Sequence, residues 1–143
     1  MHPRLPTGLT VEVARRGGDW IYGAYPGVRY RGFVPDALEF LAAARVVAVP
    51  GVGDTGVQIK TLDAIASGAQ VVASPAAVRD VEAPPSSVHV AETPEEFAAA
   101  VRRLAVAPDS RAPSPEGIEW TRRRRSQFQA AVARAAEAAV STS

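Results

Sequence analysis

Residues 45–74, RVVAVPGVGDTGVQIKTLDAIASGAQVVAS, decide the fold expected for this chain. They open with a short apolar run rich in valine, residues 46–49, and a second such run occupies residues 71–73. The segment between the runs shows a helical pattern as far as Ala66, closed by Gly68. Ahead of that helix lies a loop with three glycines, Gly51, Gly53 and Gly56. The pattern predicts a strand, a helix and a second strand, the repeating unit of a parallel sheet.

The glycine loop, residues 51–56, is expected at the carboxyl end of the first strand, where open parallel sheets bind their ligands. The first backbone N–H groups of a helix have no partner inside the helix and carry partial positive charge. A loop that leads into such a helix start is therefore suited to an anion. We expect it to bind a phosphate group.

The helix presents two faces when its residues are placed at roughly 100° intervals. The apolar side chains form a stripe that we expect to be buried, consisting of Ile59, Leu62, Ile65 and Ala66. Lys60 and Asp63 fall together on another side of the helix, with Gly56 and Ser67. A cation and a carboxylate therefore stand above the end of the helix that is suited to a phosphate.

Two interpretations of Lys60 are open. A lysine followed by an acid in the next turn can form an intrahelical ion pair, but this order is the less favourable one, and even the better order contributes only about 0.2–0.5 kcal/mol. Lys60 is also the only lysine among 16 basic residues, so arginine serves wherever any positive charge suffices. We therefore interpret Lys60 as a functional cation and Asp63 as a second candidate site residue.

Length and composition exclude several classes of protein. The chain has 143 residues, the size of one domain with a substantial core. A net charge of +1 argues against a nucleic-acid partner, which requires many phosphate contacts. No cysteine is present, which excludes disulfides, iron–sulfur clusters and thiol chemistry. His2 and His89 are the only histidines and lie far apart in the sequence, so we expect no metal site.

The sequence shows no targeting signal. Its first residues, MHPRLPTG, lack the apolar segment of a signal peptide. No apolar run approaches the ~20 residues that are needed to span a membrane. We expect a cytoplasmic protein.

The rest of the chain continues the alternation of strands and helices. We expect further strands at residues 9–14, 28–33 and 87–91, helices at residues 37–44 and 94–105, and short helical turns at residues 19–25 and after Pro75. Strict alternation is typical of the α/β class, here a mostly parallel sheet with helices on both faces. The expected organisation is a domain at residues 1–106, a Pro/Ser-rich linker at residues 107–117 and a C-terminal helix at residues 118–143.

The C-terminal helix carries a basic run of four arginines, Arg122, Arg123, Arg124 and Arg125. Four consecutive residues spread around the whole circumference of a helix, so a solvent-exposed face is the first interpretation. The alternative is docking to an acidic partner domain or peripheral contact with an anionic membrane. Trp120 and Phe128 lie eight positions apart and share a face of this helix, which we expect to pack against the domain.

The glycine loop also matches G-x-G-x-x-G, the fingerprint of dinucleotide-binding domains, which makes an NAD(P)-binding module an alternative function. That fingerprint requires an acidic residue at the end of the next strand to bind the ribose. Ser74 and Pro75 occupy this place, and Asp80 lies several residues too far along. The fingerprint also gives Lys60 no role.

A longer resemblance runs along most of the chain. The succession PGVRYRGFVPD, LAAARVVAVP, KTLDAIASGAQVVAS and HVAETPEEFAAAVRRL, within residues 9–104, resembles the carboxyl-terminal half of the glycosyltransferase group 1 family. That family has the two-domain GT-B architecture, and the resemblance implies that this chain is its Rossmann-like, donor-binding half. The implied donor is a UDP-, GDP- or ADP-sugar, the implied reaction is retaining transfer of a hexosyl group, and no further cofactor is implied.

The resemblance implies a role for each motif residue. The loop after the G-F-V strand meets the base, a place taken here by Phe33 and Val34. The acid of the K-x-x-E-A motif contacts the ribose, a place taken by Asp63. The diphosphate is held by the glycine loop and the catalytic lysine, which correspond to Gly53, Asp54, Thr55, Gly56, Val57 and Lys60.

The chain departs from the family pattern in two ways. Many members carry two glutamates eight positions apart, where this sequence has Thr55 and Asp63. The sequence also starts at what corresponds to the second strand of the domain. The resemblance therefore implies a missing first strand and a missing amino-terminal GT-B domain or partner chain, which binds the acceptor. We expect no turnover by this chain alone.

Three functions remain open from the sequence. The first is the donor-binding part of a retaining glycosyltransferase with an unknown acceptor. The second is an NAD(P)-binding module, and the third is a non-catalytic interaction domain whose surface is the basic helix. The first predicts nucleoside diphosphate binding that depends on Lys60, the second predicts dinucleotide binding that does not, and the third predicts no nucleotide binding.

Overall fold

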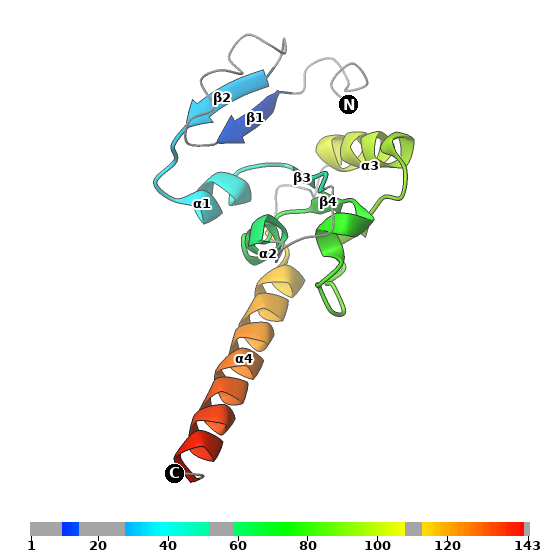
Figure 1. Ribbon diagram of the computed structural model, residues 1–143. Coiled ribbons are helices and arrows are strands. Elements are labelled where there is room, and N and C mark those ends of the chain that lie inside the picture. The colour runs from blue at the N-terminus through cyan, green and yellow to red at the C-terminus, as the bar shows by residue number, and fades with distance from the viewer. Residues whose placement is uncertain (1–9, 15–27, 52–58, 108–112, 142–143) are drawn as a thin grey trace.

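The computed structural model of the chain describes residues 10–14, 28–51, 59–107 and 113–141, and strands and helices alternate from β2 to α3 (Figure 1). The strands are β1 (Val11–Ala14), β2 (Val28–Gly32), β3 (Val47–Val49), β4 (Val71–Ala73) and β5 (Val88–Val90). The helices are α1 (Ala37–Ala42), α2 (Ile59–Ala66), α3 (Pro94–Val106) and α4 (Pro115–Ser141), with the short 3₁₀ helix η3 (Pro75–Val78) after β4. The predicted α/β class is confirmed, and the turn predicted at residues 19–25 lies outside the described residues.

The strands form two parallel sheets rather than the single sheet that the sequence predicts. β1 pairs with β2, while β3, β4 and β5 form a second sheet with β4 in its centre. Within the described residues no backbone pairing joins these two sheets.

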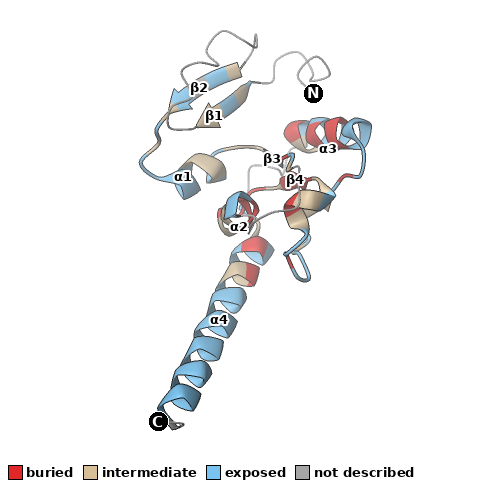
Figure 2. Cartoon of the chain, in the orientation of Figure 1, coloured by how far each residue is buried: buried red, intermediate tan, exposed pale blue. Residues whose placement is uncertain are grey.

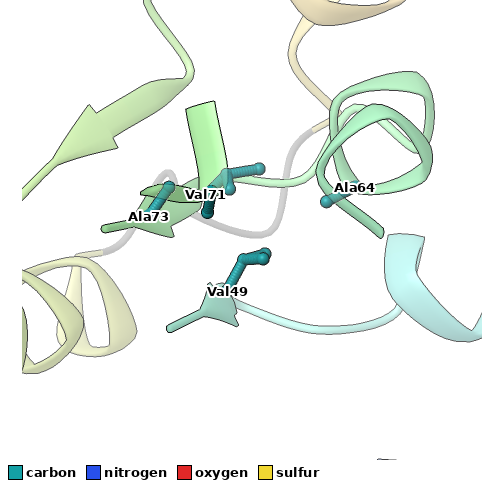
Figure 3. Packing of buried hydrophobic residues seen from close by; sticks show 5 residues of the cluster. Val49, Ala64, Val71 and Ala73 are labelled. Carbon is teal, nitrogen blue, oxygen red and sulfur yellow. The ribbon is translucent and has the colours of Figure 1, made fainter. Parts of the chain in front are cut away.

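β4 forms the centre of the core because it is covered on both faces. All of its residues have 0% exposure. Side chains alternate along a strand, so Val71 and Ala73 share one face, which packs against three residues of β3, α2 and η3, namely Val49, Ala64 and Ala77 (Figure 3). Val72 lies on the other face and packs against α3 through Phe97, Ala100 and Val101. Helices on both faces of this sheet are thus confirmed.

α2 buries only part of the apolar stripe that the sequence predicts. Ile65 is buried as predicted, and Leu62 and Ala66 are half-buried. Ile59, in contrast, is 64% exposed. Thr61 and Ala64, which lie outside the predicted stripe, are buried as well. The reason is that α2 contacts β3 and β4 and also α1 and α4, so it is covered on more than one side. Thr61 tolerates burial because its hydroxyl donates to the carbonyl of Ala77 at 2.7 Å.

α4 packs against the domain only through its first turns. Trp120 is buried with Ile65 and Val81, and its indole N–H donates to the carbonyl of Ala83 at 2.9 Å. Beyond Thr121, every residue from 122 to 140 is exposed (Figure 2). The prediction that Phe128 packs with Trp120 against the domain is wrong, because Phe128 is 69% exposed. Eight residues are about 12 Å of helix rise, so two side chains on the same face have different surroundings.

The basic run lies on the exposed part of α4. Arg122 donates two hydrogen bonds of 3.0 Å to Glu119, one turn earlier in the helix. Such an exposed pair contributes little to stability. None of the described helices, α4 included, combines the length and the apolar character that crossing a membrane requires.

Gly117 lets α4 approach α2 closely. It is buried, and a Cβ at this position would lie 2.8 Å from the carbonyl oxygen of Ile65 and 3.2 Å from the hydroxyl oxygen of Ser87. Gly68, which closes α2 as predicted and has a φ of +79°, lies in the same contact. Its carbonyl accepts a hydrogen bond of 2.6 Å from the N–H of Ser114. A side chain at residue 117 therefore has to push the two helices apart.

Gly117→Ala is expected to destabilise the chain by about 1–3 kcal/mol, the usual cost of overpacking. The sign of this change is informative, because at an exposed helix position alanine is more stabilising than glycine by about 1 kcal/mol. Urea unfolding followed by circular dichroism measures the change. Gln129→Ala, on the exposed part of α4, is the control and should stay within about 0.5 kcal/mol of the wild type. A Gly117→Ala protein more stable than the wild type would refute the close contact.

His89 lies in β5, away from the carboxyl ends of the strands. Its Nε2 atom lies 3.0 Å from Oε1 of Gln70, the residue directly before β4. Partial burial lowers the pKa of His89 below its usual value of 6.5, and the positive charge of Arg103 lowers it further. His89 therefore binds a proton less tightly in the folded chain than in the unfolded chain.

Acidification is expected to destabilise the wild type more than the His89→Gln variant. The contribution of His89 to stability is complete above the unfolded pKa of about 6.5 and is lost as the pH falls from there toward the lower pKa of the folded state. Glutamine keeps a polar side chain but does not titrate. Urea unfolding of both proteins at about pH 7.5 and about pH 5.5 measures the difference. An equal loss of stability in both proteins would show that His89 does not contribute.

Candidate functional site

The carboxyl ends of β3 and β4 meet at one edge of the three-stranded sheet, which we call the carboxyl edge. Gly51 and Ser74 follow these strands. The N–H of Ser74 donates to the carbonyl of Val49 at 3.2 Å, and the Ser74 hydroxyl donates to the carbonyl of Gly51 at 2.7 Å. A Cβ on Gly51 would lie 3.1–3.3 Å from atoms of Ala77 in η3. The start of the glycine loop is therefore fixed against the end of β4.

The middle of the glycine loop is not among the described residues. Five residues with a predicted diphosphate role lie in this part, namely Gly53, Asp54, Thr55, Gly56 and Val57. Their predicted role remains a prediction. The two ends of the segment, Gly51 and the first turn of α2, are described.

Lys60 and Asp63 lie on α2, which starts just after the glycine loop. Lys60 is exposed in the first turn, and Asp63 is half-buried in the next. Within the described ranges they form no ion pair with each other or with another residue. Ser67, predicted on the same side, is buried, and its hydroxyl donates to the carbonyl of Ala64 at 2.6 Å. The described contacts therefore do not support the intrahelical ion pair between Lys60 and Asp63.

Phe33 and Val34 directly follow β2, a strand of the other sheet. Phe33 is 62% exposed and Val34 is half-buried. Gly32 ends β2 with a φ of +67°, a conformation that glycine adopts without strain. α1 comes next in the chain and contacts α2. The predicted base-binding residues and Lys60 are thus linked through one pair of packed helices.

Sequence reasoning missed two hydroxyl side chains at the carboxyl edge. Ser74 binds the carbonyl of Gly51 and Thr61 binds the carbonyl of Ala77, both at 2.7 Å. The only signal for Ser74 was its position directly after an apolar run. No sequence signal indicated this role of Thr61, because a hydroxyl side chain within a helix usually faces solvent or forms a hydrogen bond within its own helix.

Two open hollows among the described residues lie along α4. One is lined by Glu119 and its neighbours, and the other lies between Trp120 and the prolines at residues 84–85. Neither is lined by Lys60 or Asp63.

Comparison with known proteins agrees with this arrangement. Residues 11–106, from β1 to the end of α3, match the family model described as Glycosyl transferases group 1. No curated protein sequence matches the chain. The matched part contains both parallel sheets, Lys60 and Asp63. Because the match covers well over half of the 143 residues, the chain belongs to the glycosyltransferase group 1 family.

Proposed function

We propose that this chain binds the diphosphate of a nucleotide-sugar donor at the carboxyl edge and is the donor half of a retaining glycosyltransferase. Its family gives glycosyl transfer as the general role. The observation that carries the specific proposal is Lys60. The only lysine of the chain is exposed in the first turn of α2, free of ion pairs within the described ranges, at the edge where parallel sheets bind ligands.

The charge on the leaving group explains why a lysine belongs there. As the bond between sugar and phosphate breaks, the sugar becomes oxocarbenium-like and the diphosphate gains negative charge. A positive group at that position stabilises the transition state more than the ground state. The amino end of α2 and the ammonium group of Lys60 supply this charge. Lys60 is thus the catalytic cation, and this half need not provide a base or a nucleophile.

Asp63 and Phe33 orient the donor in this proposal. The carboxylate of Asp63 accepts hydrogen bonds from the ribose hydroxyls and so positions the nucleotide without reacting. Phe33, which is 62% exposed, takes the base in this proposal, with Val34 beside it.

The acceptor belongs to another part of the enzyme. Sugar transfer requires that water be excluded from the reacting centre, and neither of the two hollows along α4 is lined by Lys60 or Asp63. We therefore assign the acceptor site to an amino-terminal GT-B domain or a partner chain that covers the carboxyl edge.

Titration calorimetry of the chain with UDP, GDP, ADP and NAD tests the proposal. One nucleoside diphosphate is expected to bind saturably. Lys60→Ala is expected to weaken its binding about tenfold or more, because a hydrogen bond to a charged group contributes about 1.5–3 kcal/mol. Arg124→Ala removes an exposed cation from α4 and is the matched control, expected to bind within about twofold of the wild type.

Two outcomes of this titration contradict the proposal. Binding of NAD that Lys60→Ala leaves unchanged would favour the dinucleotide-binding module instead. Failure of all four ligands to bind would show that this chain holds no donor site, which favours the non-catalytic interaction domain.

Asp63→Asn is expected to distinguish recognition of the ribose from recognition of the diphosphate. It should weaken binding of the preferred nucleoside diphosphate about fivefold and leave the affinity for inorganic pyrophosphate unchanged, since only the ribose hydroxyls need the carboxylate. Glu39→Gln, an exposed acid on α1, is the control. Weaker pyrophosphate binding by Asp63→Asn would rule out a role confined to the ribose.

A further inference from the structure

Two hydroxyl side chains tie the two ends of the glycine loop to one short turn, η3. We infer that Ser74 and Thr61 are positioning residues, which hold Gly51 and the first turn of α2 at a set separation for the donor diphosphate. The inference rests on the proposed function. It assigns neither residue to direct contact with the ligand.

Ser74 does not make the hydrogen bond that its position favours. It is the N-cap residue of η3, with φ −76° and ψ 161°, and serine in this position commonly accepts a hydrogen bond from an N–H of the helix it caps. No such bond forms at η3. The hydroxyl instead donates to the carbonyl of Gly51 at 2.7 Å, across the carboxyl edge. Ser74 therefore binds the start of the glycine loop at the expense of its own helix.

Thr61 likewise does not make the hydrogen bond that is usual for a threonine within a helix. Within a helix, a threonine hydroxyl usually bonds to a carbonyl of the preceding turn. Thr61 is fully buried, and its hydroxyl donates at 2.7 Å to the carbonyl of Ala77 in η3. The bond anchors the first turn of α2, in which Lys60 is the adjacent residue. The other end of the glycine loop is thus tied to η3 as well.

η3 is suited to act as the anchor because it is part of the core. Ala77 has 0% exposure and packs in the cluster around β4. Gly51 approaches it so closely that a Cβ on Gly51 would lie 3.1 Å from the Cβ of Ala77. Both ends of the glycine loop therefore contact the same buried turn. A binding site that is already ordered loses less conformational entropy when the ligand binds.

The test compares the loss of these two hydroxyls with the loss of similar hydroxyls elsewhere. Ser74→Ala and Thr61→Val are the test variants, while Ser74→Thr and Thr61→Ser keep the hydroxyl group. Ser67→Ala removes a 2.6 Å hydrogen bond at the far end of α2, and Thr121→Val removes a 3.0 Å bond within α4. These two variants are matched controls, because each also deletes a bond from a hydroxyl to a backbone carbonyl.

The probes are inorganic pyrophosphate and whichever of UDP, GDP and ADP binds the wild type most tightly. Calorimetry measures affinity, and urea unfolding measures stability in parallel. Ser74→Ala and Thr61→Val are expected to bind both probes about fivefold more weakly. The variants that keep the hydroxyl and the matched controls should stay within about twofold of the wild type. A purely structural role would lower stability in the test variants without lowering the affinity of the folded protein.

The outcomes separate this inference from the proposed function. If folded Ser74→Ala and Thr61→Val bind like the wild type while Lys60→Ala does not, the inference is overturned and the donor site stands. If the wild type binds neither probe, the proposed function fails, and hydrogen exchange of residues 51–60 decides the anchoring by itself. Exchange about fivefold faster in the two test variants than in the controls would support anchoring, and equal exchange would overturn it.

Discussion

The complete burial of β4 is the constraint on which the rest of the structure depends. Its residues Val71, Val72 and Ala73 have 0% exposure, so the strand needs cover on both faces. α2 and η3 provide it on one side and α3 on the other. Because β3 and β5 pair with β4 in parallel, the carboxyl ends of these strands meet at one edge. The packing of one short strand therefore decides where the candidate site lies.

Small side chains allow the carboxyl edge to be tightly ordered. Ala64 and Ala77 bring α2 and η3 close to β4, and Gly51 passes beside η3 in a space that a Cβ would fill. At this separation the hydroxyls of Thr61 and Ser74 reach backbone carbonyls across the gaps between elements. Electrostatic catalysis depends on charges that are in place before the reaction starts. Lys60 can act as the proposed catalytic cation only if the first turn of α2, which carries it, is held in place.

The parts farthest from β4 are the least covered. The sheet of β1 and β2 lies apart from the sheet of β3 to β5, with α1 between them in the chain, and α4 extends away from the core (Figure 1). Phe128 and Val140 on α4 are 69% and 75% exposed, and Phe33 after β2 is 62% exposed. In the proposed enzyme, the donor base covers Phe33, and the acceptor domain or partner chain provides surfaces that can meet the exposed apolar side chains of α4.

The sequence by itself determined the local structure: which segments become strands or helices, that Gly68 closes α2, and that Lys60 lies in the first turn after the glycine loop. These features follow from periodicity, backbone preference and chain order, which are properties of neighbouring residues. Only the tertiary structure decided that Thr61 is buried while Ile59 is exposed, and that Phe128 lies in solvent. The physical reason is that the environment of a side chain is set by segments distant in the sequence, such as η3 beside α2, and no local pattern records their position.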